Sequence, residues 1–448
     1  MRSHQCSTTG WDRPAAETND RSPGYAVPME TNHTHPTRRA VVRNGLAALA
    51  VLVAPAGAIG CASTVRRPPK KDGDTGTESI PAAPRLRSLI DRIGPLGTAN
   101  ADGIKLPTGF SIRIVARSGE AVLPDGHKWH VWPDGGATFA TNDGGWIYVS
   151  NSELPIAGGV GALRFDATGT LIDAYPILKG TNVNCAGGPT PWGTWLSCEE
   201  VANGRVFETD PWGAVEAIER PSLGRFKHEA ATVDPEYGCV YLSEDETDGR
   251  LYRFQSSVTD EHGHPSLTEG VLQVAVVDTS GTVTWRPIPD PLAEHSPTRE
   301  QVPEATVFNG GEGIWWFDGT VYLSTKGDNR IWAYTTATQT IRTVYDRTTA
   351  EDPDALYGVD NLTVSACGDV LVAEDGGQMR IVAVMPNGEL KPLVQIEGQD
   401  ESEITGPAFD PSGTRLYFSS QRATGLLGGI TYEITGPFHE PLPDDEAC

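Results

Sequence analysis

The sequence predicts an all-β fold, and more specifically a six-bladed β-propeller. The first observation is composition: the 448 residues include 50 Gly, 34 Pro, 11 Trp and 12 Tyr, which is typical of many short strands joined by tight turns. The second is an internal repeat of roughly 40 to 50 residues, a period typical of propeller blades. The body of the chain has no long stretch with the 3.6-residue period of an amphipathic helix.

Each repeat has a short apolar strand that ends in polar residues, then a turn and a second strand. The first strands read GWIYVSNSE (145–153), GTWLSCEE (193–200), GCVYLSEDE (238–246), GTVYLSTKGD (319–328), GDVLVAEDGG (368–377) and TRLYFSSQ (414–421). Their first residues lie 48, 45, 81, 49 and 46 positions apart. The long interval predicts one insertion, at about residues 255–303, and the six units predict six blades. A β-sandwich with chance similarity between strands is the alternative.

The N-terminal region resembles an export signal. Arg38 and Arg39 form a twin-arginine pair, and the apolar run that follows, 45–60, is too short to span a bilayer as a mature helix. The segment Ala-Ile-Gly-Cys before and at Cys61 resembles a lipobox, which predicts a lipid anchor on that cysteine. Simple signal cleavage is the alternative. The sequence thus predicts a protein exported by the twin-arginine route and either secreted or attached to the cell envelope.

These features divide the chain into four predicted parts. They are an upstream extension before a start at Met29 (1–28), the signal peptide (29–60), a flexible Pro-, Lys- and Arg-rich linker (61–105) and one propeller domain (106–440).

The formal net charge of −24 excludes one class of function. A nucleic-acid-binding protein needs a basic face to displace the counterions of the phosphates, and this chain offers none. One interpretation of the acid excess is a solvated surface. The other is that some carboxylates converge on cations.

One polar residue recurs just upstream of each repeated strand. The set is Asp134, Cys185, Glu229, Glu312, Asp360 and Glu403, with spacings of 51, 44, 83, 48 and 43. Because the innermost strand of each blade faces the central channel, we expect these side chains to meet at its axis. Like charges crowded there repel unless cations compensate them. Carboxylates suit Ca²⁺ or Mg²⁺, whereas a thiolate among them favours iron or zinc.

A second set of polar residues stands at the end of the next strand. The pairs are Asn151 and Glu153, Glu199 and Glu200, Glu244 and Asp245, and Glu374 and Asp375. Since alternate residues of a strand face opposite ways, we expect one of each pair to reach the channel. Glu199 and Glu244 are equally compatible with ordinary strand-end acids.

The other cysteines and a histidine have simpler interpretations. Cys198, Cys239 and Cys367 are predicted to be core or turn residues, and His228 is predicted to pack or to donate a hydrogen bond. A disulfide between Cys185 and Cys198 remains an alternative to a free thiol in the ring.

Five blocks of the chain resemble, in order, the motifs of the PhoX-type alkaline phosphatases. They are NCAGGPTPWGTWLSCEE (184–200), GRFKHEAATVD (224–234), EGIWWFDGTVYLSTKGDNRIWAY (312–334), VDNLTVSACGDVLVAEDGG (359–377) and SEITGPAFDPSGTRLYFSSQ (402–421). The resemblance runs from about 106 to 437. It implies a six-bladed propeller with a cluster of two irons and three calciums, joined by a bridging oxide, at the end of the central channel. Calcium alone is the alternative.

The resemblance also implies ligands. Cys185 matches an iron ligand, and Glu200, Glu229 and Glu312 match metal ligands. Asp360, Glu374 and Asp375 fall where further ligands are expected. The repeat pattern adds Asp134, Asn151, Glu244 and Glu403 to the predicted metal-binding residues.

Two departures from the family leave substrate range and activity open. The family's Asn-His-Glu reads Asn151-Ser152-Glu153 here, and the chain is shorter than well-characterised members.

The predicted function is hydrolysis of phosphate monoesters by a metal-bound oxide or hydroxide nucleophile. No Ser-His-Asp or G-x-S-x-G pattern offers a side-chain nucleophile. Lys326, Arg225 and Arg330 are candidates for holding the phosphate, although each is also compatible with a surface cation. The alternatives are a non-catalytic calcium-bound propeller of the cell envelope and a lactonase-like propeller hydrolase, whose site needs no thiolate. We expect a monomer that acts on small phosphorylated substrates.

Overall fold

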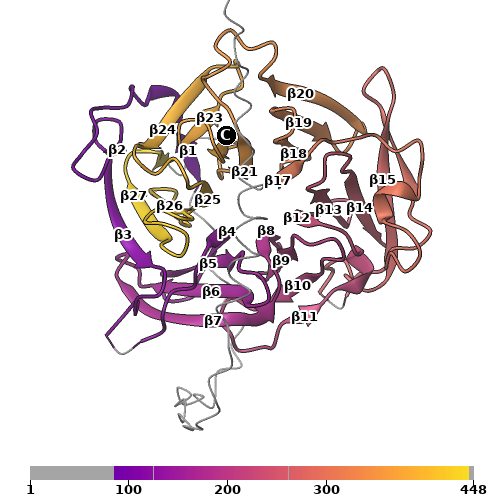
Figure 1. The fold of residues 1–448 in the computed structure, drawn as a ribbon, viewed down its shortest axis with the longest axis horizontal. Coiled ribbons are helices and arrows are strands. Elements are labelled where there is room, and N and C mark those ends of the chain that lie inside the picture. The colour runs from indigo at the N-terminus through magenta and orange to yellow at the C-terminus, as the bar shows by residue number, and fades with distance from the viewer. Residues whose placement is uncertain (1–84, 125, 261, 443–448) are drawn as a thin grey trace, which may run out of the picture. The chain divides into compact units, whose positions relative to one another are not determined.

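The computed structural model describes residues 85–442, apart from 125 and 261, and these belong to one compact unit. The predicted signal peptide, lipobox and start site lie outside the described residues. Within the described part of the chain, six sheets of four or five strands surround a central axis, so the prediction of a six-bladed propeller is confirmed (Figure 1). None of the helices described there is long and apolar enough to cross a membrane.

Four blades follow one another along the chain as antiparallel sheets, with the first strand innermost. Blade one is β4 (Pro133–Ala140), β5 (Trp146–Ser152), β6 (Gly158–Phe165) and β7 (Leu171–Thr181); blade two is β8 (Asn184–Pro189), β9 (Trp195–Glu199), β10 (Val206–Thr209) and β11 (Ile218–Glu219); blade three is β12 (His228–Asp234), β13 (Cys239–Glu244), β14 (Leu251–Ser256), β15 (Gly270–Val277) and β16 (Val283–Pro287); blade four is β17 (Gly311–Phe317), β18 (Thr320–Thr325), β19 (Arg330–Thr335) and β20 (Thr340–Asp346).

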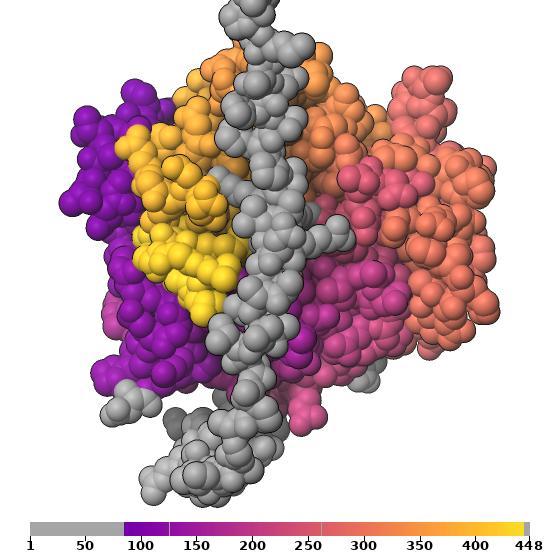
Figure 2. Space-filling view, in the orientation of Figure 1, coloured from indigo at the N-terminus to yellow at the C-terminus, as the bar shows by residue number. Residues whose placement is uncertain are grey.

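The last two blades combine strands from both ends of the domain. Blade five is β21 (Val359–Val364), β22 (Val370–Glu374), β23 (Arg380–Val384) and β24 (Leu390–Ile396) with β2 (Ile104–Lys105) outside; blade six is β25 (Ile404–Phe409), β26 (Arg415–Ser420) and β27 (Ile430–Thr435) with β3 (Ser111–Arg117) outside. Strand β3 pairs with β27 from Ser111 opposite Thr435 to Arg117 opposite Ile430. Figure 2 shows this closure as the indigo segment lying against the yellow one.

The hydrophobic core lies between the blades. One cluster joins Leu196 and Cys198 of blade two to Leu242 and Tyr252 of blade three. Another joins Trp146 and Phe165 of blade one to Tyr417 of blade six. Because each blade is covered by its neighbours on both faces, its second strand is largely buried, and β5, β9, β13 and β22 are buried along their whole length.

One domain boundary differs from the prediction, and the predicted insertion forms part of a blade. Residues 86–105 are part of the domain and not a linker: β1 (Leu86–Ser88) pairs with β28 (His439–Pro441), and Ile90 in the 3-10 helix η1 (Ile90–Arg92) is fully buried. A few apolar residues among charged ones were enough to anchor this segment. The proposed insertion at 255–303 supplies β15 and β16, so it completes blade three, and it also contains the short helix η3 (Thr298–Glu300); helix η2 (Pro221–Leu223) precedes the blade.

Candidate metal centre

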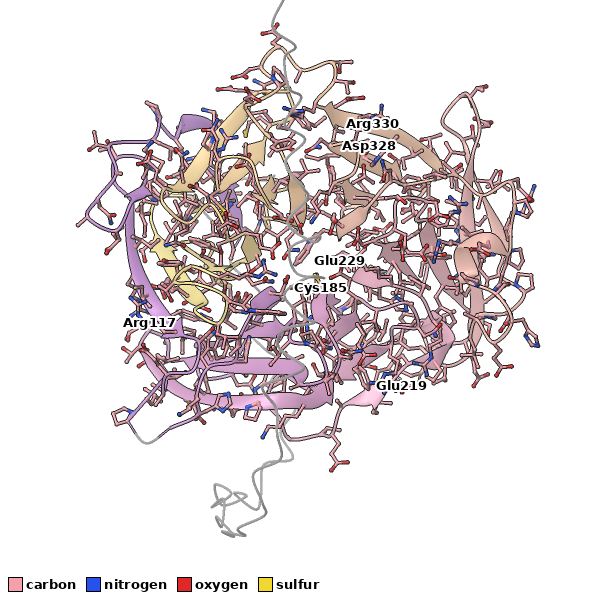
Figure 3. All side chains as sticks on the ribbon, viewed as in Figure 1. Arg117, Cys185, Glu219, Glu229, Asp328 and Arg330 are labelled. Atoms are coloured by element: carbon pink, nitrogen blue, oxygen red, sulfur yellow. The ribbon has the colours of Figure 1, made fainter. Side chains whose placement is uncertain are left out.

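The inner strands share an irregularity that positions the ring residues. In each blade the pairing of the first two strands shifts register after the strand's first or second residue, for example between Asn184 and Gly187 and between His228 and Ala231. A bulge of this kind re-aims a side chain. The second residues of five inner strands are Asp134, Cys185, Glu229, Glu312 and Asp360. Figure 3 shows Cys185 and Glu229 at the centre of the ring.

Blade six departs from the predicted pattern. Pro133 in blade one and Asn184 in blade two each pair with the last residue of the second strand, and each directly precedes the ring residue. In blade six the residue with this pairing is Ile404, so the equivalent ring position is Thr405. The Thr405 hydroxyl donates to the Pro133 carbonyl at 2.7 Å. Glu403 lies two residues earlier, and its backbone forms an isolated antiparallel β-bridge with Asp375 of blade five. It nevertheless reaches the centre.

Small residues allow the inner strands to approach one another closely. A Cβ on Gly135 would lie 2.5 Å from the Cα of Ala186, and a Cβ on Gly313 would lie 2.3 Å from the nitrogen of Leu362. Real side chains cannot approach so closely, so only glycine fits at these positions. The close approach brings ring residues of neighbouring blades within reach of one cation.

A second tier comes from the residue that directly follows the second strand of each blade. These residues are Glu153, Glu200, Asp245, Lys326, Asp375 and Gln421. The residue before each of them ends the strand and points elsewhere. Three of those preceding residues are Glu199, Glu244 and Glu374, the first acids of the predicted pairs.

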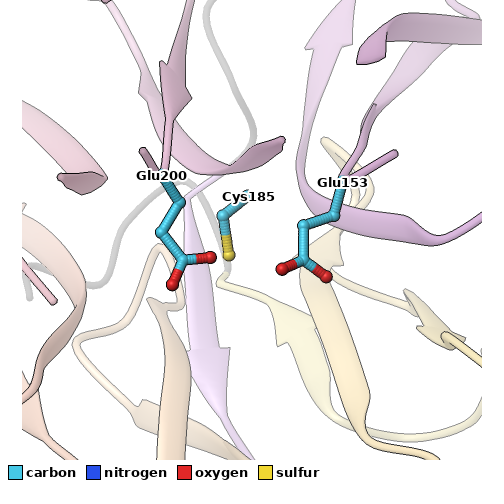
Figure 4. A group of neighbouring side chains, drawn as sticks. All are labelled: Glu153, Cys185 and Glu200. Carbon is cyan, nitrogen blue, oxygen red and sulfur yellow. The ribbon is translucent and has the colours of Figure 1, made fainter. Parts of the chain in front are cut away.

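The two tiers converge into four groups whose ligand atoms all lie within 4.8 Å of one another. The groups are Glu153, Cys185 and Glu200; Asp134, Glu153 and Glu403; Glu229, Glu312 and Asp360; and Asp360, Asp375 and Glu403. Figure 4 shows the first group, with the Cys185 sulfur between two carboxylates. Shared members link the groups, so the arrangement resembles a multinuclear centre more than four separate sites.

The thiol of Cys185 is buried and free. Its Sγ donates to Oε1 of Glu229 at 3.0 Å. Burial raises the pKa of Cys185 well above its ordinary value, and the nearby carboxylates, Asp134 first, raise the pKa further. A nearby multivalent cation has the opposite effect and deprotonates a coordinating thiol. Since Cys198 is also free and lies in the core, the structure contains no Cys185–Cys198 disulfide.

The negative charge of the buried carboxylates in the centre is not fully compensated by nearby cations. Burial raises the pKa of Asp134 well above its ordinary value, and the charges of Glu153 and Glu403 add to this effect. The pKa of Glu403 is raised by burial and by Asp375, while Arg422 opposes the shift. A cation in the centre would relieve both shifts, because it stabilises the charged form of each acid.

Three basic side chains reach the edge of the centre. Lys227 Nζ lies 3.1 Å from Glu200 and 2.6 Å from Asp245. Arg422 pairs with Glu403 at 2.7 Å and with Glu153 at 3.4 Å. Lys326 pairs with Glu312, Asp360 and Asp375. The four groups hold eight carboxylates, so these three bases leave an excess of negative charge.

Two predicted acidic ligands, Glu374 and Glu244, lie outside the four groups. Glu374 is fully buried and pairs with Arg380 at 2.7 Å, and it also accepts the backbone N–H of Gln378. Glu244 accepts the Tyr252 hydroxyl at 2.9 Å and lies 3.5 Å from Arg299; burial raises its pKa to about 7.

Asn151 belongs to the channel wall, since its amide donates to the carbonyls of Cys185 and Ala186 and accepts from Trp195. These contacts hold Asn151 against the backbone of Cys185, and its role as a metal ligand stays a prediction.

Two predicted phosphate-holding residues also lie away from the centre. Arg225 pairs with Glu219. Arg330 pairs with Asp328 and Asp346, both at 2.8 Å. Figure 3 places Glu219, Asp328 and Arg330 away from Cys185 and Glu229. Lys326 is the predicted cation that the structure does bring to the centre.

The sequence patterns left other members of the centre unidentified. Glu153 and Asp245 were predicted only as alternatives within pairs, and Lys227, Gln421 and Arg422 were not predicted at all. A signal was present, because each second-tier residue directly follows a repeated strand. His228 was correctly predicted to pack: it is fully buried against Phe226, with Nε2 3.2 Å from the Gly224 carbonyl.

Comparison with known proteins supports the same family. The family model "Alkaline phosphatase PhoX" matches residues 151–209 and 202–340. The structure of Pseudomonas fluorescens PhoX in complex with vanadate, a transition state analogue, superposes with a TM-score of 0.64 at 18% identity, covering 79% of this chain and 98% of that one.

A gluconolactonase from Xanthomonas campestris aligns with a TM-score of 0.41 at 15% identity, covering 77% of this chain and 98% of that one. No curated protein sequence matches the chain. The family-model match runs from the end of β5 in blade one to the start of β20 in blade four, and the superposition shows that this chain shares the fold of Pseudomonas fluorescens PhoX.

Proposed function

We propose that the chain is a metal-dependent phosphatase that hydrolyses small phosphate monoesters. The observation that carries the proposal is the convergence of eight carboxylates and one thiol into four linked groups at the axis of the propeller. A buried array of this charge is unfavourable without cations. The family match adds the reaction class.

The donors fit a mixed cluster of iron and calcium. Cys185 supplies a sulfur donor next to Glu153 and Glu200, a combination that favours a transition metal. The groups that contain Asp360 offer oxygen donors alone, which favours calcium. When bound, such a cluster neutralises the phosphoryl oxygens and activates the attacking oxygen.

The protein's own residues have three roles in this proposal. The ring and second-tier side chains hold the ions in fixed positions, because bulged strands and close glycines fix their backbone. Asn151 keeps the bulge of β8 at Cys185 in place through hydrogen bonds to the carbonyls of Cys185 and Ala186. Arg422, which stacks over Trp132, pairs with Glu403 and Glu153, so it orients two ligand carboxylates and opposes the rise in the pKa of Glu403.

We also propose that the protein works outside the cytoplasm. The support is the twin-arginine pair and the apolar run in the N-terminal sequence. Lipidation of Cys61 would attach the protein to the envelope, and labelling of the mature protein with a fatty-acid probe would detect it.

The test combines metal analysis with a chromogenic phosphate-ester assay on wild type, Cys185→Ala and Cys198→Ala. Cys198 is a matched control, since it is an equally buried thiol 13 residues away in the core and belongs to none of the four groups. We expect wild type and Cys198→Ala to contain iron and calcium and to turn over the ester, and Cys185→Ala to lose both iron and activity. Calcium without iron and without turnover in wild type would instead favour a calcium-bound binding protein.

A further inference from the structure

Lys326 occupies a second-tier position that most other blades fill with an acid. The equivalent residues are Glu153, Glu200, Asp245, Asp375 and Gln421. Because these positions are related by the repeat, they direct their side chains to the same axis. Blade four alone among the described blades places a positive charge there.

The Lys326 ammonium lies among three carboxylates of the centre. Nζ is 2.6 Å from Oδ2 of Asp360, 2.8 Å from Oδ2 of Asp375 and 3.3 Å from Oε1 of Glu312. Glu312 is fully buried, and the side chains of Asp360 and Asp375 are 4% and 10% exposed. These carboxylates belong to two of the four candidate metal groups. The ammonium therefore stands where a cation bound to those groups would compete with it.

The backbone around Lys326 is held in place. Its N–H donates to the Gly310 carbonyl at 2.8 Å, and its carbonyl accepts from the Asn329 side chain at 3.1 Å. Gly327 packs so closely on Asn309 that a Cβ would lie 2.2 Å from it. The lysine stem thus starts from a fixed point and is directed at the centre.

An ammonium group has three donors, and here three carboxylates lie around it. This distribution leaves no donor for a phosphoryl oxygen while the contacts persist. We infer that Lys326 is a built-in cation that takes the place of one calcium ion in the centre, and not a phosphate-holding residue. The inference rests on the cation-binding part of the proposed function and does not require turnover.

The experiment counts calcium in wild type, Lys326→Gln, Lys326→Arg and Lys105→Gln. Lys105 is the matched control. It lies on the outer strand β2, at the opposite edge of the sheet from the inner strand β21, and it pairs there with Glu397. Each protein is dialysed against buffered calcium, and calcium per chain is measured by elemental analysis. Thermal unfolding is followed over the same range of calcium concentrations.

We expect Lys326→Gln to bind one more calcium per chain than wild type, since three oxygen-donor carboxylates become available. Its unfolding temperature should rise with calcium over a range in which that of wild type stays constant. Lys326→Arg and Lys105→Gln should bind as many ions as wild type. An unchanged calcium count in Lys326→Gln would overturn the inference, and so would failure of that variant to fold at every calcium concentration.

Two further results separate this inference from the proposed function. If wild type hydrolyses no ester while Lys326→Gln gains a calcium, the phosphatase proposal fails and the inference stands. If wild type hydrolyses the ester, and Lys326→Gln keeps its calcium count but is inhibited less by inorganic phosphate, the lysine holds the anion and the inference is wrong.

Discussion

Adjacent carboxylates at the end of β9 provide a direct test of how this centre is built. Glu199 ends the strand and Glu200 follows it. Glu199 accepts Nε and Nη2 of Arg205, both at 2.7 Å, and the backbone N–H groups of Asn182 and Arg205. Glu200 contacts Lys227 and belongs to the group with Cys185. We therefore expect Glu199→Gln to impair folding and Glu200→Gln to impair metal binding.

The size of the folding effect follows from burial. Breaking a fully buried ion pair costs about 3 to 5 kcal/mol. The Glu199 side chain is 2% exposed, but that of Arg205 is 34% exposed, so solvent screening reduces the cost to about 2 to 3 kcal/mol. With an unfolding entropy of about 2.1 cal/mol/K per residue over roughly 360 residues, this free energy corresponds to a decrease of about 3 to 4 °C in Tm.

The assay is thermal unfolding in the presence of a chelator, followed by metal analysis and ester turnover after reloading. Glu199→Gln should unfold at a lower temperature than wild type and should keep its metal content once folded. Glu200→Gln should unfold within about 1 °C of wild type in chelator, because Lys227 keeps its contact with Asp245. The reasoning is refuted if Glu199→Gln loses metal without loss of stability, or if Glu200→Gln is the less stable variant in chelator.

Three further predictions concern the centre and its support. Cys185→Ser should lower iron content roughly tenfold or more while calcium stays bound, because oxygen replaces the sulfur donor; elemental analysis that finds unchanged iron would contradict the assignment. Burial lowers the pKa of His228 to about 3 from its ordinary 6.5, so the unfolded state binds the extra proton as pH falls below 6.5, and stability decreases. His228→Gln should remove about 1.4 kcal/mol of the loss in unfolding free energy between pH 7.5 and 5.5, measured by denaturant titration, and an identical pH profile would exclude this role. A Cβ on Gly188 would lie 1.8 Å from the Ala231 carbonyl oxygen, whereas one on Gly94 would meet nothing within 4 Å; Gly188→Ala should therefore cost about 3 kcal/mol of unfolding free energy and Gly94→Ala almost none, and equal Tm values would contradict this account.

The repeat made the fold and the inner ring predictable. Strands recur at a near-constant interval, so a residue at one blade position returns to the axis in every blade. The spacing did not find the ring position of blade six, because the register there places Thr405, two residues after Glu403, at the equivalent point. Spacing along the chain does not record where the pairing shifts register.

The second tier was only half predictable. The pair pattern indicated that one acid would face the channel, but not that it would be the residue just after the strand. The structural reason is that the last residue of the strand faces an arginine at the start of the next strand. Glu374 accepts the backbone N–H of Arg380, and Glu199 accepts that of Arg205. Arg380 is six residues from Glu374 in the sequence. A predicted strand–turn–strand unit does not give the pairing register of the two strands, so it could not identify this arginine as the partner.

The junction between blade six and blade one adds a constraint on assembly. Gln421 and Asp134, which meet there at 2.5 Å, are 287 positions apart, and the group of Asp134, Glu153 and Glu403 joins the first blade to the last. Contacts between segments so distant in sequence form late in folding. An ion at this junction could therefore be captured only by a chain synthesised almost to its end, and once captured it would fasten the two ends of the ring together.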